Sequence, residues 1–134
     1  MSLALALPLM ASACAGDGTE IVDKALGGRA LDPTLASIQE HVFTPICTDC
    51  HVPGGQGPMP LDSASASYQS LVNQPSLEVS LLRVAPGDPA NSYLVIKLQG
   101  APRIVGERMP LGKAPLTPEQ IQAIVDWIAS GAEP

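Results

Sequence analysis

The residues best suited to chemistry lie in one short run, Cys47-Thr48-Asp49-Cys50-His51. Its C-x-x-C-H spacing is that of a site that attaches a c-type haem. On a helical turn, positions i, i+3 and i+4 share one face. Cys47 and Cys50 can therefore form thioethers with two vinyl groups of the haem, and His51 can offer its imidazole to the iron as the proximal ligand.

Three other uses of this cysteine pair stay open at the level of sequence. A thioredoxin-like redox pair needs a strand-to-helix context in a βαβ fold, which the sequence does not offer. A structural zinc site needs further ligands, and only Cys14 and His41 remain. An ordinary disulfide can form in a secreted chain. We favour haem attachment because the motif, an export signal and a helical frame with long loops agree.

The iron needs a second axial ligand, and methionine or histidine can supply it. Met109 lies in the loop Arg108-Met109-Pro110-Leu111-Gly112, which can lay a thioether across the other haem face. Met59 follows His51 by only eight residues. The extended length of these residues does not exclude Met59 as the second ligand, but the chain must first lead away from the proximal side of the haem. His41 is expected at the surface. Core filling is the alternative role for any methionine, and we select Met109.

A haem also carries two propionates, for which arginine, tyrosine, serine and backbone donors are expected partners. The candidates are Arg83, Tyr93, Lys97 and Arg103, and we select Arg83 and Tyr93 as cofactor-binding residues. In the alternative interpretation, Arg83 and Arg103 are solvated loop charges and Tyr93 belongs to the core.

The charge distribution constrains the partners. The chain has a net charge of −6, yet residues 97–113 carry four basic side chains against one acidic side chain. This segment can steer an acidic redox partner or balance the propionates. The chain has no overall basic excess, which argues against a general nucleic-acid binder.

The N-terminal residues resemble a signal sequence for export. Residues 1–13 are uncharged and apolar with small residues at the end, as in a secretory signal, although a positive n-region is missing. Two A-x-A sites overlap here, and Cys14 can alternatively be a lipidated lipoprotein cysteine. An uncleaved anchor is a third interpretation. We assign 1–15 as leader, 16–31 as linker and 32–134 as the haem domain, and expect a periplasmic protein with potential membrane anchoring through Cys14.

The rest of the chain predicts an all-α domain of about four short helices joined by long Pro/Gly loops. Asp32-Pro33 predicts the start of a helix over 33–43, which Pro45 interrupts. The further helices are expected after a cap at Ser63 or Ser65, from Asp88 to Gly100, and from the capping box at Thr117 to Gly131. Residues 52–60 and 101–116 are predicted loops, and 79–84 is ambiguous.

The small number of aromatic residues fits this interpretation. The 134 residues include one Trp, two Tyr and one Phe, although 46% of the chain is hydrophobic. Aromatic side chains usually supply much of a small domain's buried area. A haem is a large, mostly apolar disc that can replace several of them. The domain is therefore expected to fold poorly without haem.

With these motifs in order, the chain resembles a small bacterial class I monohaem cytochrome c, in particular the periplasmic cytochrome c-like domains of proteobacteria. The resemblance covers nearly all of 33–132 and rests on four segments: CTDCH, 86–95, 108–112, and the last helix with Asp126-Trp127-Ile128. It implies a cytochrome c-like fold that wraps one covalent haem, with Cys47 and Cys50 as thioether sites, His51 proximal and Met109 distal.

The resemblance also implies packing of the N-terminal helix against the C-terminal helix. Trp127 and the stripe Ile121, Ile124 and Ile128 would pack on Phe43 and Ile38. The chain departs from the family in the loop after the motif, which reads Val52-Pro53-Gly54-Gly55. The usual proline whose carbonyl orients the proximal imidazole cannot be assigned, and Pro53 and Pro58 are both options.

The expected function is one-electron transfer between redox partner proteins in the periplasm. With both axial positions filled, iron does not readily bind substrate, and a His/Met pair raises the potential relative to bis-His ligation. No catalytic residue is predicted, so the chain is not expected to be an enzyme. The first alternative is an electron-accepting haem subunit of a dehydrogenase or respiratory complex. The second, if Met109 does not ligate, is a haem peroxidase or gas-ligand sensor.

Overall fold

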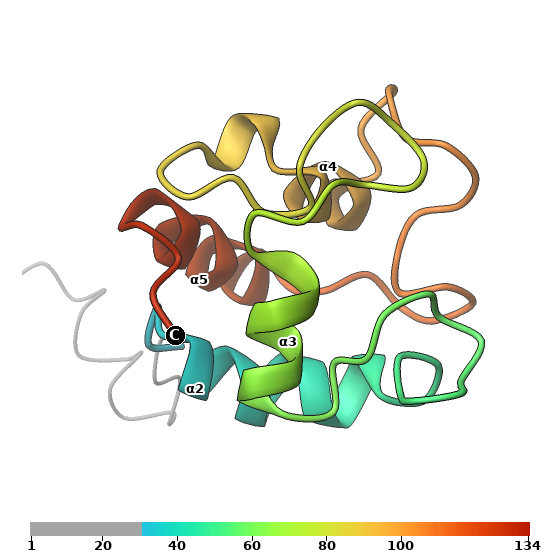
Figure 1. The fold of residues 1–134 in the computed structure, drawn as a ribbon, viewed down its shortest axis with the longest axis horizontal. Coiled ribbons are helices and arrows are strands. Elements are labelled where there is room, and N and C mark those ends of the chain that lie inside the picture. Colours follow the sequence, from blue (N-terminus) through green and yellow to red (C-terminus); the bar gives the residue numbers. More distant parts are fainter. Residues whose placement is uncertain (1–30) are drawn as a thin grey trace, which may run out of the picture.

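The computed structural model describes residues 31–134, and the predicted leader, most of the linker and Cys14 lie outside these residues. Helices dominate the described part of the chain (Figure 1). Within it, the only β pairing consists of two isolated bridges, Val72 with Val84 and Pro75 with Leu82, so the ambiguous stretch 79–84 forms no strand. The expected all-α class is confirmed. The elements are α2 (Leu35–Ile38), the π-helix η1 (Gln39–Cys47), α3 (Ala64–Leu71), the 3₁₀-helix η2 (Pro89–Asn91), α4 (Tyr93–Gln99) and α5 (Pro118–Ala129).

The first helical segment differs from its prediction at both ends. Its N-cap is Thr34, whose Oγ1 accepts a hydrogen bond from the Ser37 N–H at 3.2 Å, so the Asp32-Pro33 start was wrong by two residues. The helix also continues through Pro45 to Cys47. A proline lacks the N–H of a regular helical bond. The wider i→i+5 turns of η1, seen where Thr48 N–H bonds the Phe43 carbonyl at 3.2 Å, accommodate it.

The later helices begin and end largely at the predicted caps. Ser63 caps α3, and Thr117 and Gln120 form the predicted capping box of α5. The helix expected from Asp88 is divided in two, because Asp88 caps only η2 and Ser92 is extended before α4 starts. Gly100 then ends α4 in the left-handed conformation with φ +67°.

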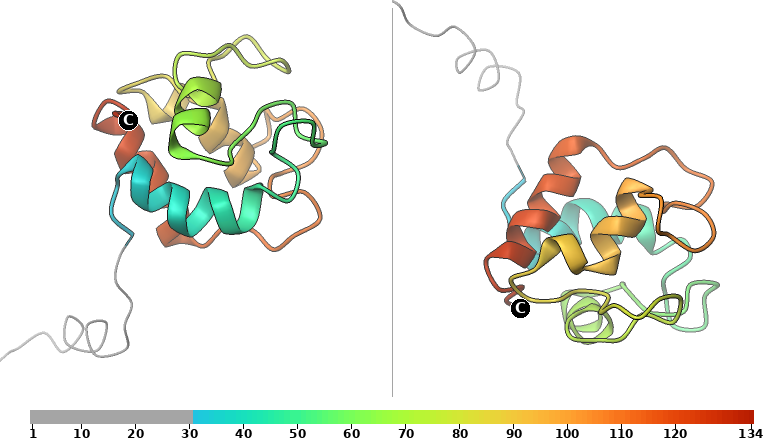
Figure 2. Two further views of the ribbon diagram at one scale, coloured as in Figure 1. Left: turned by 60° about the horizontal axis from the view of Figure 1, so that its bottom comes forward. Right: turned by 90° about the horizontal axis from the view of Figure 1, so that it is seen from above.

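The core lies where α5 packs against α2 and α4 (Figure 2). Trp127, Ile38 and Phe43 are buried together, as the resemblance implied, and the Trp127 indole N–H donates to the Glu133 carbonyl at 2.7 Å. Most other core residues are aliphatic, and burying each such side chain stabilises the fold by roughly 1.5–3 kcal/mol. The remaining fully buried aliphatic residues are Leu35, Val42, Leu71, Val84, Ile124 and Ile128.

The long loops gather at the end of the molecule away from the C-terminus (Figure 1). They comprise residues 52–62, 74–82 and 101–116, so the predicted loops 52–60 and 101–116 are confirmed. No helix within 31–134 is long and apolar enough to cross a membrane. The helices therefore form a packed frame at one end, and the loops are free to enclose a site at the other.

Candidate functional site

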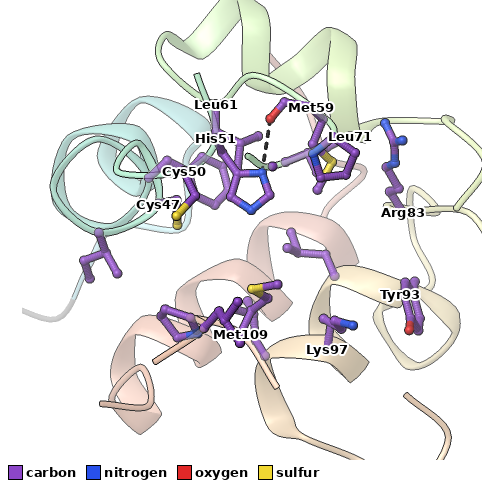
Figure 3. Close-up of a pocket in the computed structure, with 18 of the residues that line it drawn as sticks. Cys47, Cys50, His51, Met59, Leu61, Leu71, Arg83, Tyr93, Lys97 and Met109 are labelled. Atoms are coloured by element: carbon purple, nitrogen blue, oxygen red, sulfur yellow. Dashed lines mark hydrogen bonds between the residues drawn. The ribbon is translucent and has the colours of Figure 1, made fainter. Parts of the chain in front are cut away.

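A cavity of about 280 Å³ lies among these loops (Figure 3). Its size is near the lower end of the range for small-molecule and cofactor sites, and well above that of a packing defect. Most of its wall is apolar. The lining aliphatic and aromatic residues come from η1, α3, α4 and the loops, and include Val42, Phe43, Ile46, Leu61, Leu71, Leu94, Leu98, Leu111 and Leu116.

The C-x-x-C-H run forms one edge of the cavity. Cys47 is the last residue of η1, and the N–H groups of Cys50 and His51 bond its carbonyl at 3.2 and 2.9 Å. This continues the helical turn and brings all three side chains to the cavity wall. Cys47 and Cys50, the cysteines of residues 31–134, are free thiols. The predicted convergence of the three residues is therefore present in the fold.

The protonation of Cys47 does not favour a thiol redox site at this residue. Burial raises the pKa of the Cys47 thiol to about 11, although the Lys113 ammonium acts in the opposite direction. Catalytic cysteines of thioredoxin-like pairs have a lowered pKa, because the thiolate is the nucleophile. Cys47 is a neutral thiol near pH 7 and does not have that property.

His51 is oriented by the loop that follows it. In the Nδ1–H tautomer its ring donates to the Met59 carbonyl, with an N···O distance of 3.1 Å. The partner is thus neither Pro53 nor Pro58, but the residue after Pro58. This bond fixes the ring and leaves Nε2 as the nitrogen available to a metal, the arrangement that second-shell partners give to ligating histidines.

Gly57 allows this loop to approach the imidazole. A Cβ at this position would lie 2.6 Å from His51 Cε1 and 2.7 Å from Cγ, closer than side-chain atoms can pack. The Gly57 N–H also donates to the Cys50 carbonyl at 2.8 Å, which ties the loop to the motif. Any larger residue at position 57 would displace the ring.

Met109 lies across the cavity from His51, whereas Met59 lies on the His51 side (Figure 3). Met109 is half-buried, and its N–H bonds the Lys97 carbonyl at 3.2 Å, which fixes this loop to α4. His41 is 52% exposed at its side chain and does not line the cavity. Of the three axial candidates weighed from the sequence, only Met109 lies on the wall opposite His51.

Arg83 and Tyr93 both line the cavity, at the end away from the cysteines (Figure 3). Each is engaged by the protein itself. Arg83 Nη1 donates to the Ser70 carbonyl at 2.8 Å, and the Tyr93 hydroxyl donates to Glu78 Oε2 at 2.5 Å. Arg103 bonds the Ala90 carbonyl and lines a separate surface hollow instead of this cavity.

The Glu78 carboxylate accepts hydrogen bonds from two of the residues that are candidate propionate partners. Its Oε2 accepts from both Tyr93 and Lys97, the latter at 2.8 Å. The bonds from Lys97 and then Tyr93 lower the pKa of the Glu78 carboxyl. Lys97, whose side chain is only 11% exposed, also donates to the Val105 carbonyl. The pair Tyr93–Lys97 thus recognises a carboxylate at the cavity wall.

Lys113 connects the two sides of the cavity. From the loop that carries Met109, its Nζ donates to the Ile46 carbonyl at 3.1 Å and pairs with the Asp49 carboxylate. Asp49 lies between the two cysteines of the motif. Two of the four basic residues of 97–113, Lys97 and Lys113, are therefore paired with carboxylates within the molecule.

Several residues that shape the site were not predicted. The Met59 carbonyl, Gly57, Glu78 and the Lys113–Asp49 pair all depend on how loops distant from the helices fold back. Lys113 lies in the basic segment 97–113, and the only sequence signal for the close approach at Gly57 was the glycine-rich composition of 52–57. That signal indicates close backbone approach but does not name the partner.

The donor set and the walls fit a haem. Two thiols lie at one edge, an imidazole and a thioether lie on opposite walls, and carboxylate-binding groups lie at the far end, which matches the placement of vinyl groups and propionates on opposite halves of the ring. The zinc alternative gains no support, because residues 31–134 contain no cluster of three or more His, Cys, Asp or Glu side chains able to hold a metal. Comparisons of the chain with family models, with curated proteins and with solved structures found no match.

Proposed function

We propose that the protein is a periplasmic one-electron carrier with a single c-type haem, attached through Cys47 and Cys50 and ligated by His51 and Met109. One observation carries the proposal: the fold brings the C-x-x-C-H motif and Met109 to opposite sides of one apolar cavity. This arrangement supports the proposal, because neither the cavity nor the position of Met109 opposite His51 follows from the motif itself.

In this proposal each residue has a distinct task. The bound haem supplies an iron that accepts one electron from a reduced partner and passes it to an oxidised one. Cys47 and Cys50 fix the ring by thioethers. The Met59 carbonyl keeps His51 in the Nδ1–H tautomer and increases the donor strength of Nε2. The Met109 thioether favours the ferrous state.

The apolar wall has a further consequence for electron transfer. Leu61, Leu71, Leu94 and Leu98 exclude water from the ring and lower the local dielectric, which disfavours the more highly charged ferric site. Tyr93 and Lys97 can bind a propionate in place of, or beside, Glu78.

The test is a redox titration with a ligand challenge. Exported, full-length protein should show a reversible one-electron transition of a low-spin c-type haem, and its ferrous form should not bind carbon monoxide. Binding of carbon monoxide by the unmodified ferrous protein would instead support the gas-sensor or peroxidase alternative. Isolation of the protein in a stable complex with a dehydrogenase would support the subunit alternative.

A further inference from the structure

A polar cluster lies between η1 and α3, next to the loop that orients His51; its Gln39 and Ser67 are buried, and Thr44 is exposed. It consists of Gln39, Ser67, Thr44 and the Leu61 carbonyl. The Gln39 amide nitrogen donates to the Leu61 carbonyl at 2.8 Å and to Thr44 Oγ1 at 3.0 Å. The Gln39 amide oxygen accepts from Ser67 Oγ at 2.7 Å. Both N–H groups and the carbonyl of this amide are therefore used.

The cluster stands out against its surroundings. Gln39 is 8% exposed and Ser67 is fully buried, while the neighbouring residues Ile38, Val42 and Phe43 belong to the apolar core. Polar groups are costly to bury unless they are bonded, and a fully satisfied network fixes the geometry of its members. Gln39 is also the first residue of η1, and its bond to Thr44 spans five positions, the spacing of a π-turn.

The cluster reaches His51 through one short segment. Leu61, whose carbonyl is bound by Gln39, donates its own N–H to the His51 carbonyl at 2.8 Å. Two residues earlier, the Met59 carbonyl accepts the bond from His51 Nδ1 at 3.1 Å. Gln39 therefore fixes one end of the segment 59–61, and the imidazole depends on the other end.

We propose that Gln39 is a positioning residue for His51. Its amide, held in register by Ser67 of α3, places the segment 59–61 so that the Met59 carbonyl accepts the Nδ1–H bond and Nε2 is directed into the cavity. The part of this inference that concerns iron rests on the proposed function. A stronger bond at Nδ1 increases the basicity of the imidazole, which stabilises ferric iron. Loss of the Gln39 contact should therefore raise the midpoint potential.

The test compares Gln39→Leu with Thr44→Val. Thr44→Val removes one partner of the amide but keeps the bond to Leu61, so it is the matched control. In Gln39→Leu we expect the solvent exchange of the His51 Nδ1–H, followed by NMR in the ferrous state, to become about tenfold faster, since one buried hydrogen bond contributes on that order. The midpoint potential should rise. Thr44→Val should leave both measurements unchanged, and Ser67→Ala should give a smaller change in the same direction.

Two outcomes would overturn the inference: a folded Gln39→Leu protein with unchanged exchange and potential, or a Thr44→Val protein that changes as much. If Gln39→Leu does not fold, Gln39→Met offers an unbranched apolar side chain of similar length for the same measurements. If the wild-type protein folds without haem, the proposed function is refuted, and exchange of the His51 ring proton, now measured in the haem-free protein, still tests the positioning role. The two failures are therefore distinguishable.

Discussion

The side of the cavity that carries His51 and the side that carries Met109 are built in different ways. We call residues 46–61 the His51 wall and residues 101–116 the Met109 wall. Bonds within the His51 wall close it on itself: Gly57 to Cys50 at 2.8 Å, Leu61 to His51 at 2.8 Å, and the imidazole to Met59. The Met109 wall is attached mainly to other elements, through Met109 to α4 and through Lys113 to the opposite wall.

The difference indicates which of the two proposed ligands, His51 or Met109, can be replaced with the smaller effect on the site. A loop held mostly by its own bonds keeps most of its geometry when a neighbouring element shifts, although the Gln39 contact still sets the position of residues 59–61. A loop attached at a few distant points moves when any of those points is lost. We therefore expect changes that displace the His51 ring to abolish the site, and changes in the Met109 wall to alter its properties while leaving it assembled.

The largest expected effect comes from Gly57→Ala. The new methyl group would overlap the His51 ring, so the imidazole must move and its Met59 bond is lost. We expect at least a several-fold fall in the yield of haem-bound protein and loss of the low-spin spectrum. The matched control is Gly54→Ala, where a Cβ meets nothing within 4 Å and only the positive φ of 75° is strained, at about 1 kcal/mol. Equal yields of the two variants would contradict the close packing assigned to Gly57.

Met109→Ala should have the next largest effect. We expect loss of the methionine–iron charge-transfer band, a lower midpoint potential and new binding of carbon monoxide, while the haem stays attached. Truncating a half-buried methionine should also lower the free energy of unfolding by about 2 kcal/mol. Met59→Ala is the control and should keep the band, because Met59 lies on the His51 side. The opposite pattern in visible spectra would transfer the ligand role to Met59.

A smaller effect is expected when the connection between the walls is cut. Lys113→Met removes the pair with Asp49 and the bond to Ile46, both near the surface. Exposed pairs contribute about 1 kcal/mol or less, so chemical denaturation should show a loss of that size. Asp49→Asn completes a double-mutant cycle. A coupling energy near zero, together with unchanged displacement of Met109 by added imidazole, would show that this pair does not hold the walls together.

The smallest effect is expected from the Glu78 carboxylate, which Tyr93 and Lys97 bind at the cavity wall. The folded-state pKa of Glu78 is lowered by Lys97 and Tyr93 from an ordinary value of 4.5. The ionised carboxylate therefore contributes stability above about that pH and loses it as the pH falls through the folded pKa. Compared with Glu78→Gln in urea denaturation, wild-type protein should be more stable at pH 7 by less than about 1 kcal/mol. The gap should close in acid, and a gap independent of pH would contradict the pairing.

Local patterns in the sequence predicted most of the frame. Thr117 and Gln120, Ser63, and Gly100 act through bonds within one turn, so their residue types were sufficient to place helix ends. The expectation that Pro45 would interrupt the first helix was wrong, because it assumed regular α-turns. The π-turns of η1 leave room for a residue without an N–H. The change from α-turns to π-turns depends on how the whole segment packs, and a rule based on the proline alone does not describe it.

The site was predictable in its chemistry and less so in its geometry. C-x-x-C-H is a contiguous motif, so Cys47, Cys50 and His51 could be named together. The orienting carbonyl of Met59 depends on how the loop 52–62 closes, and no side-chain type encodes a backbone acceptor. The side-chain chemistry of Tyr93 and Arg83 was enough to select them as candidate cofactor-binding residues. Their bonds to Glu78 and to the Ser70 carbonyl could not be predicted, because folding alone brings those loops together.

The central claim is that a haem is bonded covalently to this motif. The most direct test is the intact mass and visible spectrum of the full chain, exported in a bacterium that matures c-type cytochromes and analysed under denaturing conditions. The account predicts the mass of the processed chain plus one haem, with a c-type spectrum that survives denaturation and is lost in the Cys47→Ser, Cys50→Ser double variant. A wild-type chain with the mass of the polypeptide alone and no haem absorption would contradict it.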